Sequence, residues 1–200
     1  QRFMVLSTQS EQGPYCSLLA FAASQAAAES PAEAYNPLFI HAGTGLGKTH
    51  LLQAIGQEVH QNDNDRNIEY LSSEEFANGY ISALRERRLP AFRQHYRNVD
   101  LLLIDDVHFF TGKDQLQEEF FHTFNELQQS DKQIILTSDK PPKSIPALEK
   151  RLLSRFESGM VADVSQPDIE TKIAILEEKA KEKSYSLERE VLEFIANNIK

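Results

Sequence analysis

Short apolar runs alternate with longer amphipathic segments along the middle of this chain. The clearest run is Leu-Leu-Leu-Ile at residues 101–104, and four apolar residues bounded by charge are typical of a strand buried on both faces. The alternation predicts an α/β fold in which a parallel five-stranded sheet is sandwiched by helices. The predicted strands cover 38–41, 67–71, 101–105, 133–137 and 160–164, and the predicted helices cover 48–60, 73–87 and 114–130.

The pattern changes near the C-terminal end of the sequence. Three prolines make residues 139–147 a connection and not a regular element. Beyond Pro167 apolar residues recur at helical spacing among many charges, and a second helix is expected from about Leu187. We therefore divide the chain into an α/β domain over residues 1–166 and the beginning of a small helical lid subdomain over residues 167–200.

Composition limits the location and the chemistry of the protein. A chain of 200 residues that is 40% hydrophobic can bury one good core. No apolar run is long enough to span a bilayer, the first residues lack the layout of a signal peptide, and the single cysteine, Cys16, fits a reducing compartment. A cytoplasmic location is therefore expected. The sole cysteine disfavours a thiol nucleophile, and the six histidines show no spacing typical of a zinc site.

A glycine-rich loop follows the first predicted strand. Residues 42–49 are Ala-Gly-Thr-Gly-Leu-Gly-Lys-Thr, directly before a predicted helix. Glycines allow successive backbone N–H groups to converge on phosphate oxygens, and the helix N-terminus adds the positive end of its dipole. The spacing is that of a phosphate-binding loop, with Ala42 in place of the first glycine of the strict pattern. The alternative, an ordinary glycine-rich turn, is disfavoured by the flanking strand and helix.

The residues of this loop have separate expected roles toward a nucleoside triphosphate. Lys48 would reach the β- and γ-phosphates, and the hydroxyl of Thr49 would ligate Mg²⁺. The predicted nucleotide-binding residues are Gly43, Thr44, Gly45, Leu46, Gly47, Lys48, Thr49 and His50.

Acidic residues follow two of the predicted strands. Asp105 would hold Mg²⁺ through water, and Asp106 would orient or deprotonate the attacking water, because open α/β sheets place ligands at the carboxyl ends of their strands. After the next strand comes Thr-Ser-Asp at residues 137–139, polar groups that could sense the γ-phosphate or its water. Taken alone, each segment is also compatible with a turn or a cap.

Two arginines, Arg151 and Arg155, are four residues apart and are therefore predicted on one face of a short helix. Guanidinium groups that project from a triphosphatase can stabilise transition-state charge in a neighbouring subunit. Surface salt bridges with Glu149 or Glu157 are the ordinary alternative.

The distribution of charge bears on nucleic-acid binding. A net charge of −9 argues against a domain that grips duplex DNA by broad charge neutralisation. Residues 85–97 nevertheless form a local basic segment that could follow a phosphate backbone while its rings stack on unpaired bases. Its alternative is a solvated amphipathic helix whose aromatic residues face the core, and spacing leaves the two open. The segment contains Arg85, Arg87, Arg88, Arg93 and Arg97, with Phe92, His95 and Tyr96 interleaved.

Six segments, in this order and spacing, resemble those of the bacterial chromosomal replication initiator family, DnaA. The resemblance covers roughly residues 35–200 and implies the AAA+ class of P-loop NTPase fold. The segments are Tyr-Asn-Pro-Leu-Phe-Ile at 35–40, Gly-Leu-Gly-Lys-Thr-His-Leu-Leu at 45–52, Leu-Ile-Asp-Asp-Val-His-Phe-Phe at 103–110, Glu-Glu-Phe-Phe-His-Thr-Phe-Asn at 118–125, Leu-Thr-Ser-Asp at 136–139 and Arg-Leu-Leu-Ser-Arg-Phe at 151–156.

The resemblance implies a role for each matched residue. It makes Lys48 and Thr49 the Walker A pair and Asp105 and Asp106 the Walker B pair. It makes Asp139 the first sensor and Arg155 the arginine finger, supported by Arg151. Residues 73–98 match an initiator-specific insertion of two helices that holds single-stranded DNA. The implied DNA contacts are Ile81, Arg85, Arg87, Arg88 and Lys113.

The same resemblance implies cofactors and partners. They are ATP or ADP with Mg²⁺, further copies of the chain in a head-to-tail oligomer, single-stranded DNA, the replicative helicase or regulators, and acidic membrane lipids. Residues 1–17 do not reproduce the family's segment near adenine. In the family, a second sensor arginine and a helix-turn-helix domain that reads duplex origin DNA follow the segment matched here, so this sequence alone is expected to bind origin duplex poorly.

The predicted function is an ATP-switched initiator of chromosomal DNA replication with weak ATPase activity. Asp106 is one methylene shorter than the glutamate that many related ATPases carry, so hydrolysis is expected to be slow and to act as a timer. The alternative is a helicase loader or regulatory adaptor of the same superfamily. A small-molecule P-loop kinase is the least favoured class, because the acidic and sensor residues suit water as the acceptor.

Overall fold

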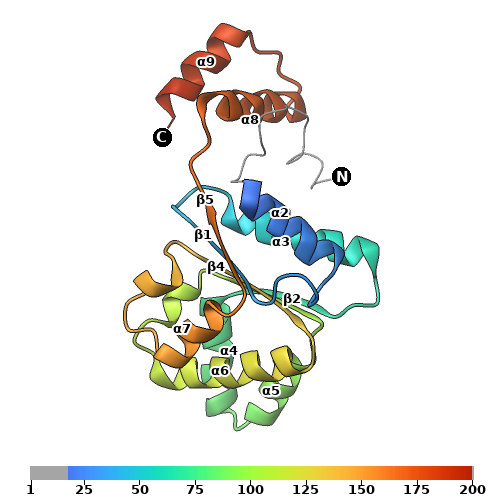
Figure 1. Ribbon diagram of the computed structural model, residues 1–200, viewed down its shortest axis with the longest axis vertical. Coiled ribbons are helices and arrows are strands. Elements are labelled where there is room, and N and C mark those ends of the chain that lie inside the picture. The colour runs from blue at the N-terminus through green and yellow to red at the C-terminus, as the bar shows by residue number, and fades with distance from the viewer. Residues whose placement is uncertain (1–17, 200) are drawn as a thin grey trace.

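The computed structural model describes residues 18–199, and its centre is a single parallel sheet (Figure 1). The order of the strands across the sheet is β2-β3-β4-β1-β5. All five predicted strands are confirmed, and their ends agree with the prediction to within one residue. Cys16 and the divergent residues 1–17 lie outside the described part. The strands are β1 (Leu38–Ala42), β2 (Ile68–Ser72), β3 (Leu101–Asp105), β4 (Gln133–Ser138) and β5 (Met160–Val164).

Helices cover both faces of this sheet (Figure 1). One face is packed against α2 (Leu18–Glu29) and α3 (Lys48–Asn62), and the opposite face against α4, α5, α6 and α7. The predicted sandwich is therefore confirmed. The bounds on the second face are α4 (Ser73–Arg85), α5 (Leu89–Arg97), α6 (Asp114–Gln129) and α7 (Lys150–Phe156), with short 3₁₀ helices η1 (Val107–Phe110) and η2 (Pro142–Ser144) between them.

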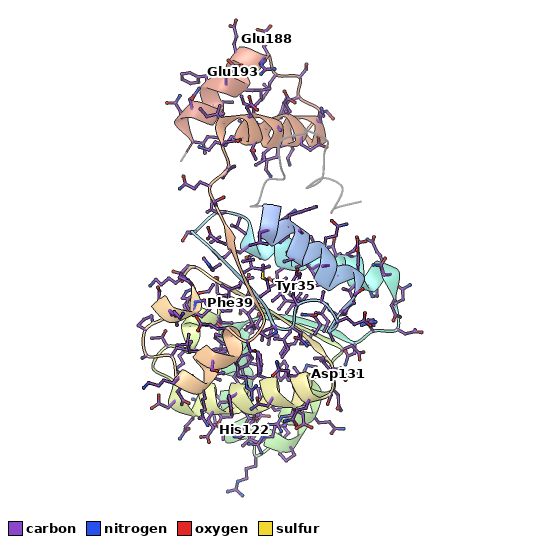
Figure 2. The ribbon with its side chains drawn as sticks, viewed as in Figure 1. Tyr35, Phe39, His122, Asp131, Glu188 and Glu193 are labelled. Carbon is purple, nitrogen blue, oxygen red and sulfur yellow. The ribbon has the colours of Figure 1, made fainter. Side chains whose placement is uncertain are left out.

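The apolar runs of the strands explain why the chain needs two helical layers. In β3, Leu101 and Leu103 belong to the core that faces α2 and α3, whereas Leu102 and Ile104 belong to the core on the other face. Successive side chains of a strand point to opposite faces, so a continuous apolar run requires cover on both sides. Phe39 of β1 lies inside the α/β body, among the side chains that fill it (Figure 2).

Local sequence signals account for the start of α4 and the break before α5. The hydroxyl of Ser72 accepts from the backbone N–H of Glu75, and the Glu75 carboxylate accepts from the Ser72 backbone, which forms a capping box. The helix ends at Arg85, two residues before the predicted end, because Arg87 has a left-handed backbone with φ of 56°. Pro90 then occupies the first turn of α5, where a missing N–H costs nothing.

The helices α8 (Ile169–Glu182) and α9 (Arg189–Asn198) pack against each other (Figure 1). Their small core contains Ile173, Leu192 and Ala196, separate from the two cores of the sheet. Glu193 lies on α9, and Glu188 lies directly before it (Figure 2). Over residues 18–199, no helix combines the length and the apolar character that crossing a bilayer demands.

The parallel strands bring the predicted site residues to one edge of the sheet. The carboxyl ends of β3, β4 and β1 are neighbours, because these strands pair in that order. The loop after β1, the acidic pair at the end of β3 and the polar residues at the end of β4 therefore meet at this edge, where α/β sheets bind their ligands.

Candidate nucleotide site

The loop between β1 and α3 has the backbone conformation of an anion-binding loop. Gly45 and Gly47 have φ values of 83° and 86°, in the left-handed region that side chains disfavour. A Cβ atom added at either position would meet nothing within 4 Å, so backbone conformation and not crowding requires glycine there. No side chain caps the N-terminus of α3 among the described residues, so its first N–H groups are available to donate to an anion.

Ala42, the departure from the strict loop pattern, belongs to the strand and not to the loop. It is the last residue of β1, is 2% exposed, and packs in the core that faces α2 and α3. Its methyl group therefore fills apolar space beneath the loop and is compatible with phosphate binding.

Lys48 holds its ammonium group beside the loop. The side chain is buried, and Nζ donates to the backbone oxygens of Ala42 at 2.9 Å and Gly43 at 3.2 Å. The surrounding loop residues from Gly43 to Gly47 are exposed or half-buried. The positive charge is thus fixed beside a loop that solvent can reach, which suits the binding of a polyphosphate.

Thr49 and Asp105 meet although 56 positions separate them in the chain. The Thr49 hydroxyl donates to Oδ2 of Asp105 at 2.5 Å, from the first turn of α3 to the end of β3. The other carboxylate oxygen of Asp105 accepts from the hydroxyl of Thr137. These groups form a cluster of oxygen ligands beside the loop. Such ligands fit Mg²⁺, which proteins bind through one or two carboxylates together with the phosphates of the substrate.

Asp106 is held in a defined and unusual conformation. Its φ is 56°, its backbone N–H donates to the Thr137 hydroxyl at 3.0 Å, and its carbonyl oxygen accepts from the Ser73 hydroxyl at 2.6 Å. Burial raises the pKa of Asp106, and the charges of Asp105 and Asp139 raise it further, while His108 and Lys48 act in the opposite direction. A carboxylate with a raised pKa is a better proton acceptor, which suits the role predicted for it.

Asp139 follows β4 and lies close to the acidic pair. Its Oδ1 atom is 3.3 Å from Nδ1 of His108, which is in turn 3.8 Å from Oδ1 of Asp106. The structure thus brings together the predicted residues of the glycine-rich loop and the ends of β3 and β4. Thr137 and Ser73 also bond to the acidic pair. No motif in the sequence indicates the contact of Ser73 with the Asp106 backbone.

Arg151 and Arg155 lie on one face of α7, as predicted from their spacing. Both guanidinium groups lie over the ring of Phe121, 4.9 Å and 5.9 Å from its centre. Arg151 also pairs with Glu149, whereas Arg155 donates to Gln128 at 3.2 Å. Among the contacts found in residues 18–199, none joins either arginine to the glycine-rich loop of its own chain.

The buried side chain of Gln117 positions the start of α7. Its amide nitrogen donates to the backbone oxygens of Phe110 and Ala147, both at 3.0 Å, and its oxygen accepts from the backbone N–H of Glu149 at 2.8 Å. Sequence reasoning missed this residue, because a glutamine in an amphipathic helix carries no sign of the distant backbone groups that it satisfies.

The basic segment of residues 85–97 divides into two parts. Phe92 and Tyr96 are buried against Phe76, with ring centroids 5.2 Å and 5.0 Å away. For Phe92 and Tyr96, the hypothesis of stacking on unpaired bases is therefore wrong, and the alternative of an amphipathic helix with these aromatics in the core is correct. The reason is that α5 must cover the apolar face of α4. His95 is exposed, so its stacking stays a prediction.

Arg93 and Arg97 are occupied by the same buried carboxylate. Glu119 of α6 is 3% exposed and accepts from Arg93 at 2.7 Å and from Arg97 at 3.0 Å. The five DNA contacts implied by the resemblance are all exposed to solvent. They are Ile81 on α4, Arg85 at the end of α4, Arg87 and Arg88 between α4 and α5, and Lys113 directly before α6.

Comparison with known proteins agrees with this geometry. Residues 12–163 match the family described as the bacterial DnaA ATPase domain. The chain belongs to the DnaA family. The match covers the sheet, the glycine-rich loop, the acidic pair and the arginines of α7, and it identifies the α/β body as the ATPase domain of this family.

Three solved structures of DnaA proteins are similar over most of the chain. Domain III of the Thermotoga maritima replication initiation protein DnaA is 46% identical, with 90% of this chain and 75% of that chain covered and a TM-score of 0.87. AMPPCP-bound DnaA from Aquifex aeolicus is 41% identical, with coverages of 91% and 56% and a TM-score of 0.86. A DnaA bound to AMPPCP and single-stranded DNA has the same identity and coverages and a TM-score of 0.85. The chain spans 56% of the length of the latter two.

Proposed function

We propose that this chain is the ATP-binding module of a chromosomal replication initiator, in which ATP acts as an assembly switch. One observation carries the nucleotide part of the proposal. The hydroxyl of Thr49 and the carboxylate of Asp105, which would hold Mg²⁺, are in contact beside the glycine-rich loop and the N-terminus of α3, which has no side-chain cap. Two DnaA relatives are bound to AMPPCP, which supports nucleotide binding by this chain.

The residues of the site divide the work of hydrolysis. Lys48 and the loop N–H groups bind the phosphate oxygens, and Asp106 orients the attacking water and accepts its proton. Asp139 contacts the γ-phosphate or its water. Mg²⁺, held by Thr49 and Asp105, would neutralise the charge that develops on the phosphate oxygens.

Hydrolysis is proposed to be slow, so that it works as a timer. The Asp106 side chain is short and its backbone is fixed by Thr137 and Ser73, so its carboxylate approaches the water less closely than a glutamate would. The ATP form assembles and the ADP form is inactive.

Assembly is proposed to be head to tail. Arg155, supported by Arg151, reaches the ATP of the next subunit. Both guanidinium groups lie on the face of α7 that carries Phe121 contacts, where Arg151 is exposed and Arg155 is half-buried. The assembled subunits hold single-stranded DNA through residues 73–98, with Lys113 from the neighbouring segment. We propose the cytoplasm as the location and residues 167–200 as the beginning of the lid subdomain.

The rival functions differ in what the ATP form binds. A helicase loader would use ATP to bind and release a protein partner. An initiator would bind single-stranded DNA through this module, whereas binding of duplex origin DNA would require a further domain. The single-stranded DNA present in one DnaA relative favours the initiator. The kinase is disfavoured, because the family is one of ATPase domains.

The deciding experiment measures binding of a fluorescent oligonucleotide by anisotropy in ATP, in ADP and without nucleotide. We expect tight binding of single-stranded DNA only in ATP with Mg²⁺, and weaker binding of a duplex of the same length. Lys48→Ala should lose the response to ATP. Binding that is indifferent to the nucleotide, or ATP binding without any DNA binding, would contradict the initiator proposal.

A further inference from the structure

His108 lies between the two carboxylates to which catalysis is assigned. It is the second residue of η1, and its Nδ1 atom is 3.3 Å from Oδ1 of Asp139 and 3.8 Å from Oδ1 of Asp106. Both Nδ1 of His108 and Oδ1 of Asp139 are shielded from solvent, and neither makes a fully aligned hydrogen bond in the described structure. Two buried polar atoms that face each other at this distance need only a small rotation to bond.

The surroundings hold the imidazole in this place. The ring of Phe109 lies against it with centroids 4.4 Å apart, and the backbone oxygen of His108 accepts from the Thr111 hydroxyl at 2.7 Å. The backbone of Asp106 is fixed at the other end of the same turn by Ser73 and Thr137. The turn from Asp106 to Thr111 is thus anchored on both sides of the imidazole.

The chemistry of the three groups specifies which ring nitrogen carries a proton. A neutral imidazole has one N–H donor and one acceptor nitrogen, and ionised carboxylates only accept. An acceptor Nδ1 would place its lone pair against two carboxylates, which is repulsive. Nδ1 is therefore the donor, and its proton points between Asp139 and Asp106.

We propose that His108 is a positioning residue, whose Nδ1–H group links the γ-phosphate sensor Asp139 to the general base Asp106. The inference rests on the proposed ATPase function, because it concerns how that site is aligned. Asp139 contacts the γ-phosphate, and through His108 it sets the orientation of the Asp106 carboxylate. Asp106 is therefore aligned to activate the attacking water when ATP is bound, and it is not aligned when ADP is bound.

Two variants at His108 separate the effect of its N–H donor from the effect of its side-chain volume. In His108→Asn, the amide nitrogen sits the same number of bonds from the backbone as Nδ1 and supplies an N–H donor. In His108→Leu, similar volume remains without a donor. His60→Leu is the control, because His60 is an exposed histidine in the last turn of α3, away from the site.

The kinetic test measures single-turnover hydrolysis and the affinities for ATP and ADP. For His108→Leu we expect hydrolysis to fall by about 10- to 100-fold, the scale of a misplaced catalytic group. The ADP affinity should stay within about twofold, whereas the preference for ATP over ADP should shrink. His108→Asn should recover most of the rate. Equal rates in the wild type, His108→Asn and His108→Leu would overturn the proposal. Equal losses of rate in His108→Asn and His108→Leu would also overturn it.

A second measurement does not depend on hydrolysis. Nitrogen chemical shifts of the His108 ring in the nucleotide-free protein report which nitrogen is protonated, and we expect Nδ1–H. Protonation at Nε2 alone would overturn the inference whatever the kinetics show. If Nδ1 is protonated but the wild-type protein neither binds nor hydrolyses ATP, the proposed function fails while the link among the three side chains stands.

Discussion

At the residue scale, the site depends on charges that the fold crowds together. Asp105, Asp106 and Asp139 converge at one edge of the sheet, and the raised pKa of Asp106 reflects its burial and these neighbours. Crowded carboxylates cost stability, and such a cost is expected where the groups serve the proposed reaction.

Replacing Asp106 with asparagine should therefore stabilise the protein while it abolishes hydrolysis. A carboxyl group with a raised pKa is penalised for being ionised in the folded state, and the neutral amide escapes that penalty. Asparagine also tolerates the left-handed backbone at this position. Calorimetry should show a higher Tm, by about 2–4 °C for each kcal/mol gained. ATP affinity should be retained, and a lower Tm would contradict the crowding argument.

The glycine-rich loop allows a paired prediction about backbone conformation. Gly47→Ala should weaken ATP binding and cost about 1–2 kcal/mol, because a side chain disfavours a φ of 86°. Ala42→Gly, which restores the strict pattern, should leave ATP affinity unchanged, since Ala42 packs in the core. Its only expected effect is a small loss of stability. Titration calorimetry of both variants with ATP tests the two predictions. Tighter ATP binding by Ala42→Gly would show that alanine at position 42 weakens nucleotide binding.

At the scale of elements, one buried carboxylate attaches α5 to α6. Burial alone would raise the pKa of Glu119, but hydrogen bonds and charge from Arg93 and Arg97 outweigh burial and hold its pKa below the ordinary value of 4.5. This arrangement explains why these two arginines are fixed to the protein, whereas Arg85, Arg87 and Arg88 remain exposed.

Glu119→Gln should lower the free energy of unfolding at neutral pH by about 1.5–3 kcal/mol, the range for hydrogen bonds to charged groups. The pKa of Glu119 is lower in the folded state than in the unfolded state, so ionised Glu119 stabilises the fold at any pH above its pKa in the unfolded state. This stabilisation is lost as the pH falls through the pKa of Glu119 in the folded state. The difference between wild type and variant should therefore be constant above about pH 5.5 and shrink below about pH 4.5. Urea unfolding across this range measures it, and a difference that grows toward acid would refute the assignment.

The helices illustrate how far the sequence predicts elements. The apolar runs of the strands are local signals, and the structure agrees with them. The capping box of Ser72 and Glu75, which the structure shows at the start of α4, is local in the same sense. The aromatic residues of α5 were ambiguous, because the spacing of Phe92 and Tyr96 describes a helix face without saying whether the face meets solvent, DNA or α4. Only packing against Phe76 decided the matter.

At the scale of the whole molecule, the two halves of the proposed catalytic apparatus lie on different elements. The glycine-rich loop and acidic pair lie at the carboxyl edge of the sheet, and the arginines of α7 contact Phe121 and Gln128 of α6 instead of that loop. This separation suits a site completed by a second copy of the chain.

A mixing experiment tests completion between subunits. Arg155→Ala and Lys48→Ala should each hydrolyse ATP far more slowly than wild type, the first for lack of the guanidinium and the second for lack of bound ATP. In a mixture, a Lys48→Ala subunit can supply Arg155 to the ATP of an Arg155→Ala subunit. The mixture should therefore exceed the sum of the separate rates, increasingly so with protein concentration. If the rate of the mixture equals the sum of the two separate rates, Arg155 does not act on the ATP of a neighbouring subunit.

The sequence by itself determined the local conformations and the chemistry of each segment. Apolar runs specified strands buried on both faces, and the glycine spacing specified a loop with left-handed backbone at Gly45 and Gly47, because these properties depend on neighbours in the chain. Phosphate binding by this loop stays a prediction from the glycine and lysine spacing. The tertiary structure alone decided which distant groups meet. The contact of Thr49 with Asp105, the pairing of Glu119 with Arg93 and Arg97, and the place of His108 between two carboxylates all depend on strand order and helix packing, which no short segment encodes.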